Sequence, residues 1–533
     1  MAIETKPLLT QRMALLARLA EPKRYDLAVI GGGATGLGVA LEAASRGYSV
    51  VLLESHDFAK GTSSRATKLV HGGVRYLAQG NLALVREALH ERSVLLNNAP
   101  HLAQPLAFVM PSYKYWEAPF YGVGLKLYDL LAGAEGLGKT EFLSRDETLQ
   151  CLPTVQPQGL KGGVRYWDGQ FDDARLALAL ARTAAQQGAL LVNYCPVTGF
   201  IHEAGQLAGV QARDEESGQT FEVRAGCIVN AAGVWVDQLR ALEGVAAGQS
   251  VTPMVAPSQG VHLVVDRSFW PTDHALLVPK TQDGRVLFAV PWLGKVILGT
   301  TDTPRDDLAR EPQAFPEEVD FILRESARYL TRAPLAEDVL SVWVGLRPLV
   351  KPPENEGHST KGLSREHTVV ISPSGLVTVT GGKWTTYRSM AEDVLVHCAE
   401  AELLQGRGGS VTAALPLVGA ILSRYKISEP AGLHSYGSEA TDVQALQGND
   451  RWLCPGLSEA MVRYAARYEY ARTVEDMLAR RSRTLFLDAK LAESLAVEVA
   501  QLLQAETGVD PQLDAFLTLC TVFQTLPGLS LEI

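Results

Sequence analysis

The chain has 533 residues, of which 47% are hydrophobic and 20% are charged, and its formal net charge is −10. At roughly 150 residues per domain this length predicts about three lobes, and the composition excludes a disordered chain or a polytopic membrane protein. The acidic balance disfavours a nucleic-acid partner, because phosphate backbones are bound mainly by clustered Lys and Arg. An anionic substrate would therefore require a local cationic pocket.

The six cysteines are scattered, without a CxxC pair or a His/Cys cluster at metal-ligand spacing. We therefore expect no metal site and a reducing, cytoplasmic location. No apolar run approaches the ~18 residues of a transmembrane helix, and the N-terminus lacks a secretory signal. Two amphipathic stretches, residues 8–20 and 113–133, leave open peripheral docking on the inner face of the cytoplasmic membrane. The alternative for each stretch is packing against the chain's own core.

The first predicted elements are a strand, a tight turn, a helix and a second strand between Tyr25 and Glu54. Residues 27–30 are apolar and β-branched, residues 34–46 are alanine-rich at helical spacing, and residues 50–53 form an apolar run. This order predicts a βαβ unit. Further along, the pattern predicts helices over 83–97 and 172–187, and short strands over 190–194, 207–213, 220–223 and 227–232.

The composition changes at Val251. From there to about Val350, Pro, Trp and β-branched residues predict an antiparallel sheet. Residues 368–382 return to a strand that enters a glycine turn, with a helix from Thr385. Residues 406–409 (GRGG) read as a linker, and the tail from about Ser458 is helical.

A GxGxxG turn, formed by Gly31, Gly33 and Gly36 and containing Thr35, lies between the first strand and the helix. Bare backbone N–H groups at a helix N-terminus bind a pyrophosphate. Glu54 ends the second strand, where a carboxylate can bind a ribose hydroxyl. These features predict a dinucleotide site over a coincidental glycine turn, but they do not distinguish NAD from FAD.

Two later stretches favour FAD. Residues 227–235 (CIVNAAGVW) resemble the second signature of two-dinucleotide-binding flavoproteins, and residues 381–388 (GGKWTTYR) form another glycine turn that enters a helix. The N-terminal dipole of such a helix can stabilise negative charge on a reduced flavin.

Four stretches in order carry a closer resemblance: residues 62–77 (TSSRATKLVHGGVRYL), 299–302 (GTTD), 345–349 (GLRPL) and 381–388. Together they resemble the FAD-dependent glycerol-3-phosphate dehydrogenases of the aerobic, bacterial type. The resemblance covers most of residues 25–390 and, more faintly, 468–483. It implies an α/β fold, with a Rossmann-like FAD-binding domain of the two-dinucleotide-binding (DAO) type, an antiparallel-sheet substrate domain and a C-terminal helical cap.

The expected domains follow from this resemblance and from the composition. The FAD-binding domain is expected to comprise residues 22–110, 155–250 and 359–405, and the substrate domain residues 251–358. Residues 111–154 are expected to form a substrate-domain or membrane-facing segment, and residues 406–533 the cap.

The resemblance also implies roles for single residues. The expected cofactor-binding residues are Gly31, Gly33, Thr35, Gly36, Glu54, Thr62, Ser63, Lys68, Leu69, Val197, Gly233, Gly382 and Lys383. The expected substrate-binding residues are Arg75, Tyr76, Arg347 and Arg365, and the expected catalytic residues are His262, Arg347 and Lys383. FAD is expected to be non-covalent, because the family counterpart of the turn at His71 contacts the cofactor without bonding to it.

Each assignment has a plainer alternative. Arg347 can be a solvated or carboxylate-paired arginine, His262 a structural histidine among apolar neighbours, and Lys68 and Lys383 surface residues. The arginine run within residues 479–483 (ARRSR) is expected to be a solvated helix face in an acidic protein.

The function implied is oxidation of sn-glycerol 3-phosphate to dihydroxyacetone phosphate, with hydride passing from C2 to the flavin N5 and electrons then passing to a membrane quinone. The alternatives are an oxidase that uses oxygen, an amine or amino-acid oxidase, and a non-catalytic flavin-binding scaffold. A lipid surface and a homodimer are further open partners.

Several stretches depart from the family pattern. The segment before Tyr25 and residues 406–458 show no recognisable counterpart, no calcium-binding loop pattern follows the cap, and no long oxidase-type insertion interrupts the substrate domain. The missing calcium-loop pattern favours the bacterial type over the mitochondrial type, and the missing insertion favours a quinone over oxygen.

Overall fold

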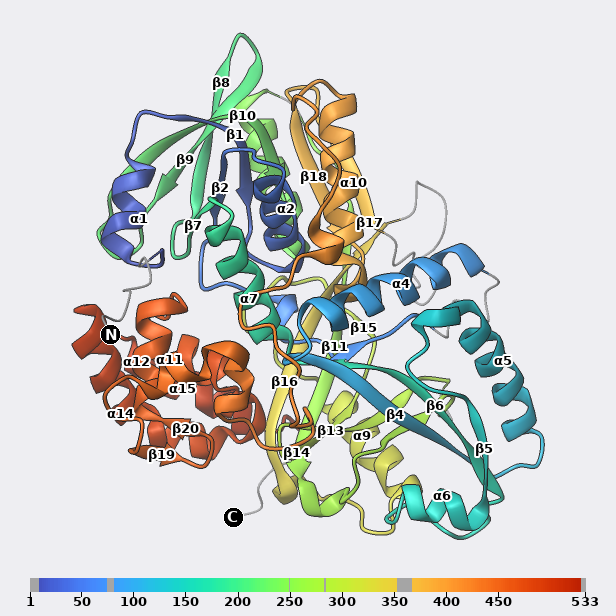
Figure 1. The fold of residues 1–533 in the computed structure, drawn as a ribbon. Helices are drawn as coiled ribbons and strands as arrows, with labels where there is room; N and C mark the ends of the chain where they lie inside the picture. The colour runs from blue at the N-terminus through green and yellow to red at the C-terminus, as the bar shows by residue number, and fades with distance from the viewer. Residues whose placement is uncertain (1–8, 74–80, 249, 282–283, 352–366, 529–533) are drawn as a thin grey trace.

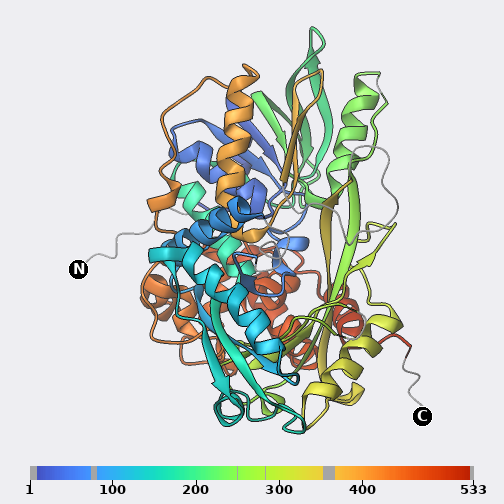
Figure 2. The same cartoon turned by 90° about the vertical axis from the view of Figure 1, so that its right-hand side faces the viewer.

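The computed structural model describes residues 9–73, 81–248, 250–281, 284–351 and 367–528. Two large sheets and a helical lobe make up the protein (Figure 1). The first sheet lies at the top of this view, the second at the lower right, and the helical lobe at the lower left, while Figure 2 shows the same parts after a 90° turn.

Within the described residues, the first sheet has eight strands. They are β1 (Arg24–Ile30), β2 (Val50–Leu53), β7 (Leu190–Val192), β8 (Val197–Glu203), β9 (Gln206–Arg213), β10 (Thr220–Asn230), β17 (His367–Ile371) and β18 (Leu376–Gly381). The order β17-β18-β10-β1-β2-β7 is parallel from β18 to β7. Strands β8 and β9 form a hairpin that adds antiparallel to β10.

Helices cover this sheet, so its central parallel strands are buried on both faces. The helices of this region are α1 (Arg12–Leu19), α2 (Ala34–Ser45), α7 (Asp173–Gln186), α8 (Val236–Ala246) and α10 (Tyr387–Glu400). Helix α2 packs against both α7 and α10. All four residues of β2 are buried, as expected for a strand covered on both sides.

The second sheet has ten strands in the described part of the chain. They are β3 (Leu69–Val70), β4 (Ala103–Ser112), β5 (Glu141–Ser144), β6 (Gly162–Phe171), β11 (Val255–Asp266), β12 (Ala275–Val278), β13 (Leu287–Trp292), β14 (Lys295–Gly299), β15 (Thr303–Pro304) and β16 (Val339–Val350). Its helices are α4 (Leu82–Asn98), α5 (Glu117–Ala132), α6 (Arg145–Cys151) and α9 (Pro316–Tyr329). Pairing is antiparallel except between β4 and β12.

The helical lobe is the C-terminal cap. It contains α11 (Ala440–Gln444), β19 (Trp452–Cys454), β20 (Leu457–Ser458), α12 (Glu459–Tyr468), a wide turn of π-helix (Asp476–Arg481), α13 (Thr484–Leu487), α14 (Ala489–Thr507) and α15 (Leu513–Gln524). Trp343 of β16 and Phe486 of α13 belong to one apolar cluster, with ring centroids 5.3 Å apart. The cap is therefore packed onto the second sheet.

The predicted fold class is confirmed, and the details differ in two places. Strand β10 runs without interruption from Thr220 to Asn230, where two strands were expected, because β1 and β9 pair with its central residues. Strands β3, β4 and β6 pair in the second sheet, although the expected division gives their residues to the flavin domain almost entirely. The domain boundaries stay a prediction.

Helix α1 settles the choice between membrane docking and core packing for the first amphipathic stretch. Leu15 and Leu19 are buried in the main apolar cluster. Arg12 connects the helix to loops of the first sheet, because it pairs with Asp214 and donates a hydrogen bond of 3.2 Å to the side chain of Asn193. The described part of this stretch packs against the core.

The arginine run at residues 479–483 contradicts the expectation of a solvated face. Arg480, Arg481 and Arg483 are at most 2% exposed. Their partners include carboxylates far away in the sequence, among them Asp57 and Asp173. The prediction was wrong because an isolated basic run in the sequence gives no sign of a buried acidic partner elsewhere.

Candidate FAD and substrate site

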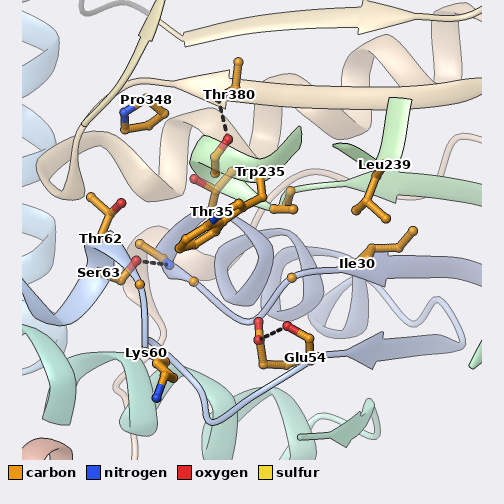
Figure 3. A pocket seen from close by; sticks show the side chains of 18 of the residues that line it. Ile30, Thr35, Glu54, Lys60, Thr62, Ser63, Trp235, Leu239, Pro348 and Thr380 are labelled. Atoms are coloured by element: carbon orange, nitrogen blue, oxygen red, sulfur yellow. Dashed lines mark hydrogen bonds between the residues drawn. The ribbon is translucent and has the colours of Figure 1, made fainter. Parts of the chain in front are cut away.

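A cavity of about 480 Å³ opens at the carboxyl ends of the parallel strands β1, β2, β10 and β18. Ligands bind at this edge of open α/β sheets, because helix N-termini and loops converge there. The lining comes from separated parts of the chain, and residues 30–35, 53–63, 231–242, 348 and 379–384 supply most of it (Figure 3).

The glycine turn is built so that only glycine fits at two positions. Gly31 has a φ of +111°, and a Cβ there would lie 2.7 Å from the carbonyl oxygen of Ala231. A Cβ on Gly36 would lie 1.9 Å from the carbonyl oxygen of Gly31. Gly33 is the N-cap of α2, whose first turn contains no acidic residue. The turn therefore leaves room and helix N–H groups for a pyrophosphate.

Glu54 lines the cavity at the end of β2. Its carboxylate accepts the backbone N–H of Gly32 at 2.6 Å and that of His56 at 2.9 Å, and the Ser55 hydroxyl at 3.1 Å. A carboxylate has about four lone-pair sites, so these bonds fix its orientation and leave acceptor capacity. This suits the role of a ribose-binding group.

At the other end of the cavity, hydrogen bonds join segments far apart in the sequence. Thr380 donates from its hydroxyl to the carbonyl of Gly233 at 3.2 Å (Figure 3). The Trp384 indole donates to the carbonyl of Ser63 at 2.8 Å, and the Ser63 hydroxyl accepts from the N–H of Ala34 at 2.9 Å. These hydrogen bonds connect the glycine turn at residues 381–382 to the glycine turn at residues 31–36.

Most residues expected to bind the cofactor line this cavity: Gly31, Gly33, Thr35, Glu54, Thr62, Ser63, Val197, Gly233, Gly382 and Lys383. The structure places Gly36, Lys68 and Leu69 outside the lining. Gly36 acts through its close approach to Gly31, and Leu69 pairs in β3 with β6.

Lys68 lies behind the cavity wall and is fully buried. Its ammonium group donates to Asp173 at 2.7 Å and to the carbonyl of Ser64 at 2.8 Å. Burial lowers the pKa of Lys68 to about 7, although the Asp173 carboxylate opposes the shift. Lys68 therefore contacts the segment that forms the wall, and its expected contact with the cofactor stays a prediction.

His262, on β11, is buried between polar and aromatic neighbours. Its ring stacks on Trp343 with centroids 4.0 Å apart, and Nε2 lies 3.0 Å from the Thr67 hydroxyl. Burial, and then the charges of Lys68 and Arg347, hold the pKa of His262 well below its usual range. The imidazole is therefore neutral at pH 7, the form that can accept a proton.

Arg347, on β16, is held in a fixed orientation. Its guanidinium donates to the carbonyls of Gln259 at 3.2 Å and Thr301 at 3.0 Å, and it lies 3.3 Å from the Asp302 carboxylate. A Cβ on Gly260 would lie 2.2 Å from Nη2, so the glycine makes room for the group. The other expected substrate ligands, Arg75, Tyr76 and Arg365, lie outside the described residues.

Some residues of the cavity were not predicted from the sequence: His56, Lys60, Trp235, Arg310 and Pro348 line it. Lys60 directly precedes the recognised Thr62 stretch, and Trp235 ends the stretch at 227–235, so both were within reach of motif reasoning. Arg310 lies 3.8 Å over the Trp235 ring and comes from a loop of the other sheet, for which the sequence holds no signal.

Comparison with known proteins agrees with this geometry. The family described as FAD dependent oxidoreductase matches residues 26–388, and the C-terminal domain of alpha-glycerophosphate oxidase matches residues 378–513. The chain is 40% identical to the mitochondrial glycerol-3-phosphate dehydrogenase of Mus musculus, over 93% of this chain and 72% of that relative. It belongs to the FAD-dependent glycerol-3-phosphate dehydrogenase family. The cofactor is FAD.

A solved member of the family supports the same assignment. The glycerol-3-phosphate dehydrogenase of Bacillus halodurans, complexed with FAD, has a TM-score of 0.77 and 31% identity, over 97% of this chain and 99% of that chain. The L-alpha-glycerophosphate oxidase of Mycoplasma pneumoniae, at 16% identity and a TM-score of 0.55, shares the fold. The expected bacterial type stays a prediction, because mitochondrial and bacterial proteins both match.

The family comparison corrects one expectation about the tail. Residues 406–458 were thought to have no counterpart, but they lie within the match to the C-terminal domain of alpha-glycerophosphate oxidase. The segment is mostly turns and short helices, so the sequence offered no periodic pattern to recognise. Across the part of the chain that the structure describes, no helix is long and apolar enough to cross a membrane, and no metal-binding cluster is found.

Proposed function

We propose that this protein oxidises sn-glycerol 3-phosphate to dihydroxyacetone phosphate. The observation that carries the proposal is the fixed guanidinium of Arg347. Arg347 lies on β16 directly before Pro348, which lines the FAD cavity. A phosphate dianion in an acidic protein needs cations held in place, and a guanidinium binds phosphate oxygens in pairs. The names of the relatives, which are glycerol-3-phosphate dehydrogenases, support the same substrate.

The remaining roles follow from the chemistry of a secondary alcohol. Bound FAD supplies a hydride acceptor for C2. The neutral imidazole of His262 takes the hydroxyl proton, so that hydride and proton leave together. Lys383, which lines the cavity and caps the helical turn after the last glycine turn, places a positive charge where negative charge develops. Arg75, Tyr76 and Arg365 complete the substrate pocket in this proposal.

An anaerobic bleaching experiment tests the function. Glycerol 3-phosphate should bleach the yellow holoenzyme, whereas glycine and sarcosine should leave the visible absorbance of the oxidised flavin unchanged. Bleaching by the amines would indicate an amino-acid oxidase. Absorbance that responds to neither class would indicate the non-catalytic scaffold.

We further propose that FAD is bound without a covalent link. His71 is the nearest candidate for attachment, and its backbone N–H and carbonyl both lie 3.3 Å from the Thr385 hydroxyl, which fixes the turn without involving the ring. Acid precipitation should release all the flavin into the supernatant. A yellow washed pellet would contradict this prediction.

The electron acceptor in this proposal is a membrane quinone, reached by peripheral docking through α5. The exposed face of this helix carries Phe120 (67% exposed) and Leu130 (76% exposed), together with Val123 and Leu127, and the exposed Trp116 directly precedes the helix. Leu125 and Tyr128 on the opposite face are buried. Exposed lysines flank the aromatic residues, with the Lys114 ammonium 5.8 Å from the Trp116 ring. Such a face binds an anionic lipid surface by burial and charge.

Replacing Phe120 and Leu130 together by serine should weaken docking. The two side chains bury apolar surface in the lipid interface, so we expect binding to phosphatidylglycerol vesicles to fall roughly tenfold or more. Cosedimentation with vesicles and quinone reduction on them measure the effect. Val497→Ser is the matched control, because Val497 is 53% exposed on α14 of the cap.

Equal vesicle binding by the wild type and the double variant would remove α5 from the docking surface. Full quinone reduction by the wild type without any lipid would remove the need for docking.

A further inference from the structure

One segment of the FAD cavity wall contacts the C-terminal cap on the side that faces away from the cavity. This wall segment, residues 54–64, contributes Glu54, Ser55, His56 and residues 59–63 to the cavity lining. Its other members, Asp57, Phe58 and Ser64, are at most 1% exposed and do not line the cavity. Apart from one short turn of 3-10 helix at Thr62–Ser64 it has no regular structure, so its shape depends on its contacts.

The first of these contacts is an ion-pair network around Asp57. Both Arg480 and Arg481 of the cap donate to its carboxylate, including a bond of 3.0 Å from Arg481 Nη2. Burial alone would raise the pKa of Asp57, but the two arginines hold it below its usual value. Asp57 is therefore a fully buried carboxylate whose charge is balanced by the cap.

Lys60 extends this network to the cavity itself. Its side chain lines the cavity, and its ammonium group lies 2.6 Å from the carboxylate of Glu475 in the cap. Glu475 in turn accepts from Arg480 at 2.7 Å. One chain of charges thus runs from the cap, through Lys60, to the surface that faces the cofactor.

Arg483 holds the far end of the wall segment. Its guanidinium donates to the carbonyl of Ser64 at 2.8 Å and to Asp173 at 3.2 Å. Lys68 binds the same carbonyl and the same carboxylate. Ser64 directly follows Ser63, whose hydroxyl accepts the N–H of Ala34 at the start of α2.

An aromatic contact connects the cap to the glycine turn. Tyr470 of the cap meets Phe58 edge-on, with ring centroids 5.1 Å apart. Phe58 packs directly on the turn, because a Cβ on Gly32 would lie 2.5 Å from its ring. The cap thus contacts the wall segment at three places: the ion-pair network at its middle, Arg483 at its end, and Tyr470 at Phe58, which packs on the pyrophosphate turn.

We propose that residues 470–483 of the cap are positioning residues for FAD: they hold the wall segment in its cofactor-binding shape, so that cap docking and FAD binding are coupled. Coupling of two binding equilibria is reciprocal. FAD should therefore stabilise the cap against local opening, although the cap does not line the cavity. Loss of a cap contact should weaken FAD binding without touching the cofactor.

Hydrogen exchange on the full-length wild-type chain tests the first half. We expect FAD, added to protein from which the flavin has been removed, to slow exchange of the amides at 475–487 at least about tenfold. Amides on the outer side of α14 should change far less. Equal exchange at 475–487 with and without FAD would overturn the proposal, whatever happens to any variant.

Arg483→Met tests the second half. Lys68 still pairs with Asp173 and with the Ser64 carbonyl in this variant, and Asp172, which lies 3.8 Å from Arg483, still accepts the backbone N–H of Arg175. We expect the Kd for FAD to rise roughly tenfold or more, and Arg483→Lys to recover part of the loss. Flavin fluorescence titration of the stripped protein measures the Kd.

Arg463→Met is the matched control. Arg463 lies on α12 and pairs with Glu459 and Glu506, both within the cap. The change removes a cap ion pair of the same kind without reaching the wall segment, so the Kd for FAD should stay within about twofold. Equal losses in the Arg463 and Arg483 variants would indicate general cap destabilisation and would overturn the proposal, as would an unchanged Kd in Arg483→Met.

Discussion

Replacing Arg347 by alanine is expected to lower kcat/KM for glycerol 3-phosphate roughly thirtyfold to a few thousandfold. Removing one partner of a buried charge pair typically costs ~2–5 kcal/mol, and ~1.4 kcal/mol corresponds to one decade. The guanidinium is already oriented by Gln259 and Thr301, so little side-chain entropy is lost when the phosphate binds. Arg365 carries the same expectation from the sequence.

Two comparisons make this prediction specific. Slow turnover of plain glycerol, which has no phosphate, should change far less, and the FAD content should stay normal because Arg347 is not among the residues that line the FAD cavity. Arg324→Ala is the control, since Arg324 is a largely exposed residue on α9, 2.7 Å from Asp320. Equal losses on glycerol and glycerol 3-phosphate would mean that Arg347 acts on the flavin or on the fold. An unchanged rate would remove it from the phosphate site.

Replacing His262 by glutamine is expected to lower kcat roughly 10²- to 10⁴-fold, the usual range for loss of a general base. The substitution keeps a polar side chain next to Thr67 and Trp343, so the protein should fold and bind FAD. Measuring kcat, KM and FAD content separates the two roles of the residue. A normal kcat combined with lower thermal stability would show that His262 is structural.

The pH profile of the wild type gives a second test of His262. Its pKa is lowered from the ordinary 6.5, first by burial and then by Lys68 and Arg347. The base form therefore persists below pH 6.5, and kcat/KM should show no fall centred at that pH. The same lowered pKa makes the stability of the fold depend on pH. The unfolded chain takes up a proton on this histidine below about pH 6.5, whereas the folded chain does so only at lower pH. The contribution of His262 to the free energy of unfolding is therefore complete above about pH 6.5 and declines below it.

The flavin site was predictable because its signals are local. The glycine turn, Glu54 and the Thr62 stretch each lie within a few residues of a strand end, where backbone geometry dictates residue type. Lys68 lies among the same residues, but its partner Asp173 comes from α7, and a sequence does not show which buried carboxylate a lysine meets. The sequence therefore indicated a lysine near the cofactor but did not indicate its contact with the wall segment.

The cap shows the same limit more clearly. Charge runs are usually solvated, and nothing in the sequence around Arg480 or Arg481 indicates burial. Their partner Asp57 lies more than 400 residues earlier, as the separation of 423 positions to Arg480 shows. Arg310 was missed for a related reason, because a loop from one sheet reaches over the cofactor cavity of the other.

The discontinuity of the FAD cavity has a consequence for biosynthesis. Its lining combines the glycine turn at Gly31, the turn at Gly233 that follows β10 and the turn at Gly382, so the pocket is incomplete until the last of these has left the ribosome. Contacts so distant in sequence are slow to form, and partly folded chains expose the apolar strands that will flank them. A nascent chain that ends before Gly381 should bind no flavin, which makes the cofactor a ligand of the nearly finished protein rather than a template for its early folding.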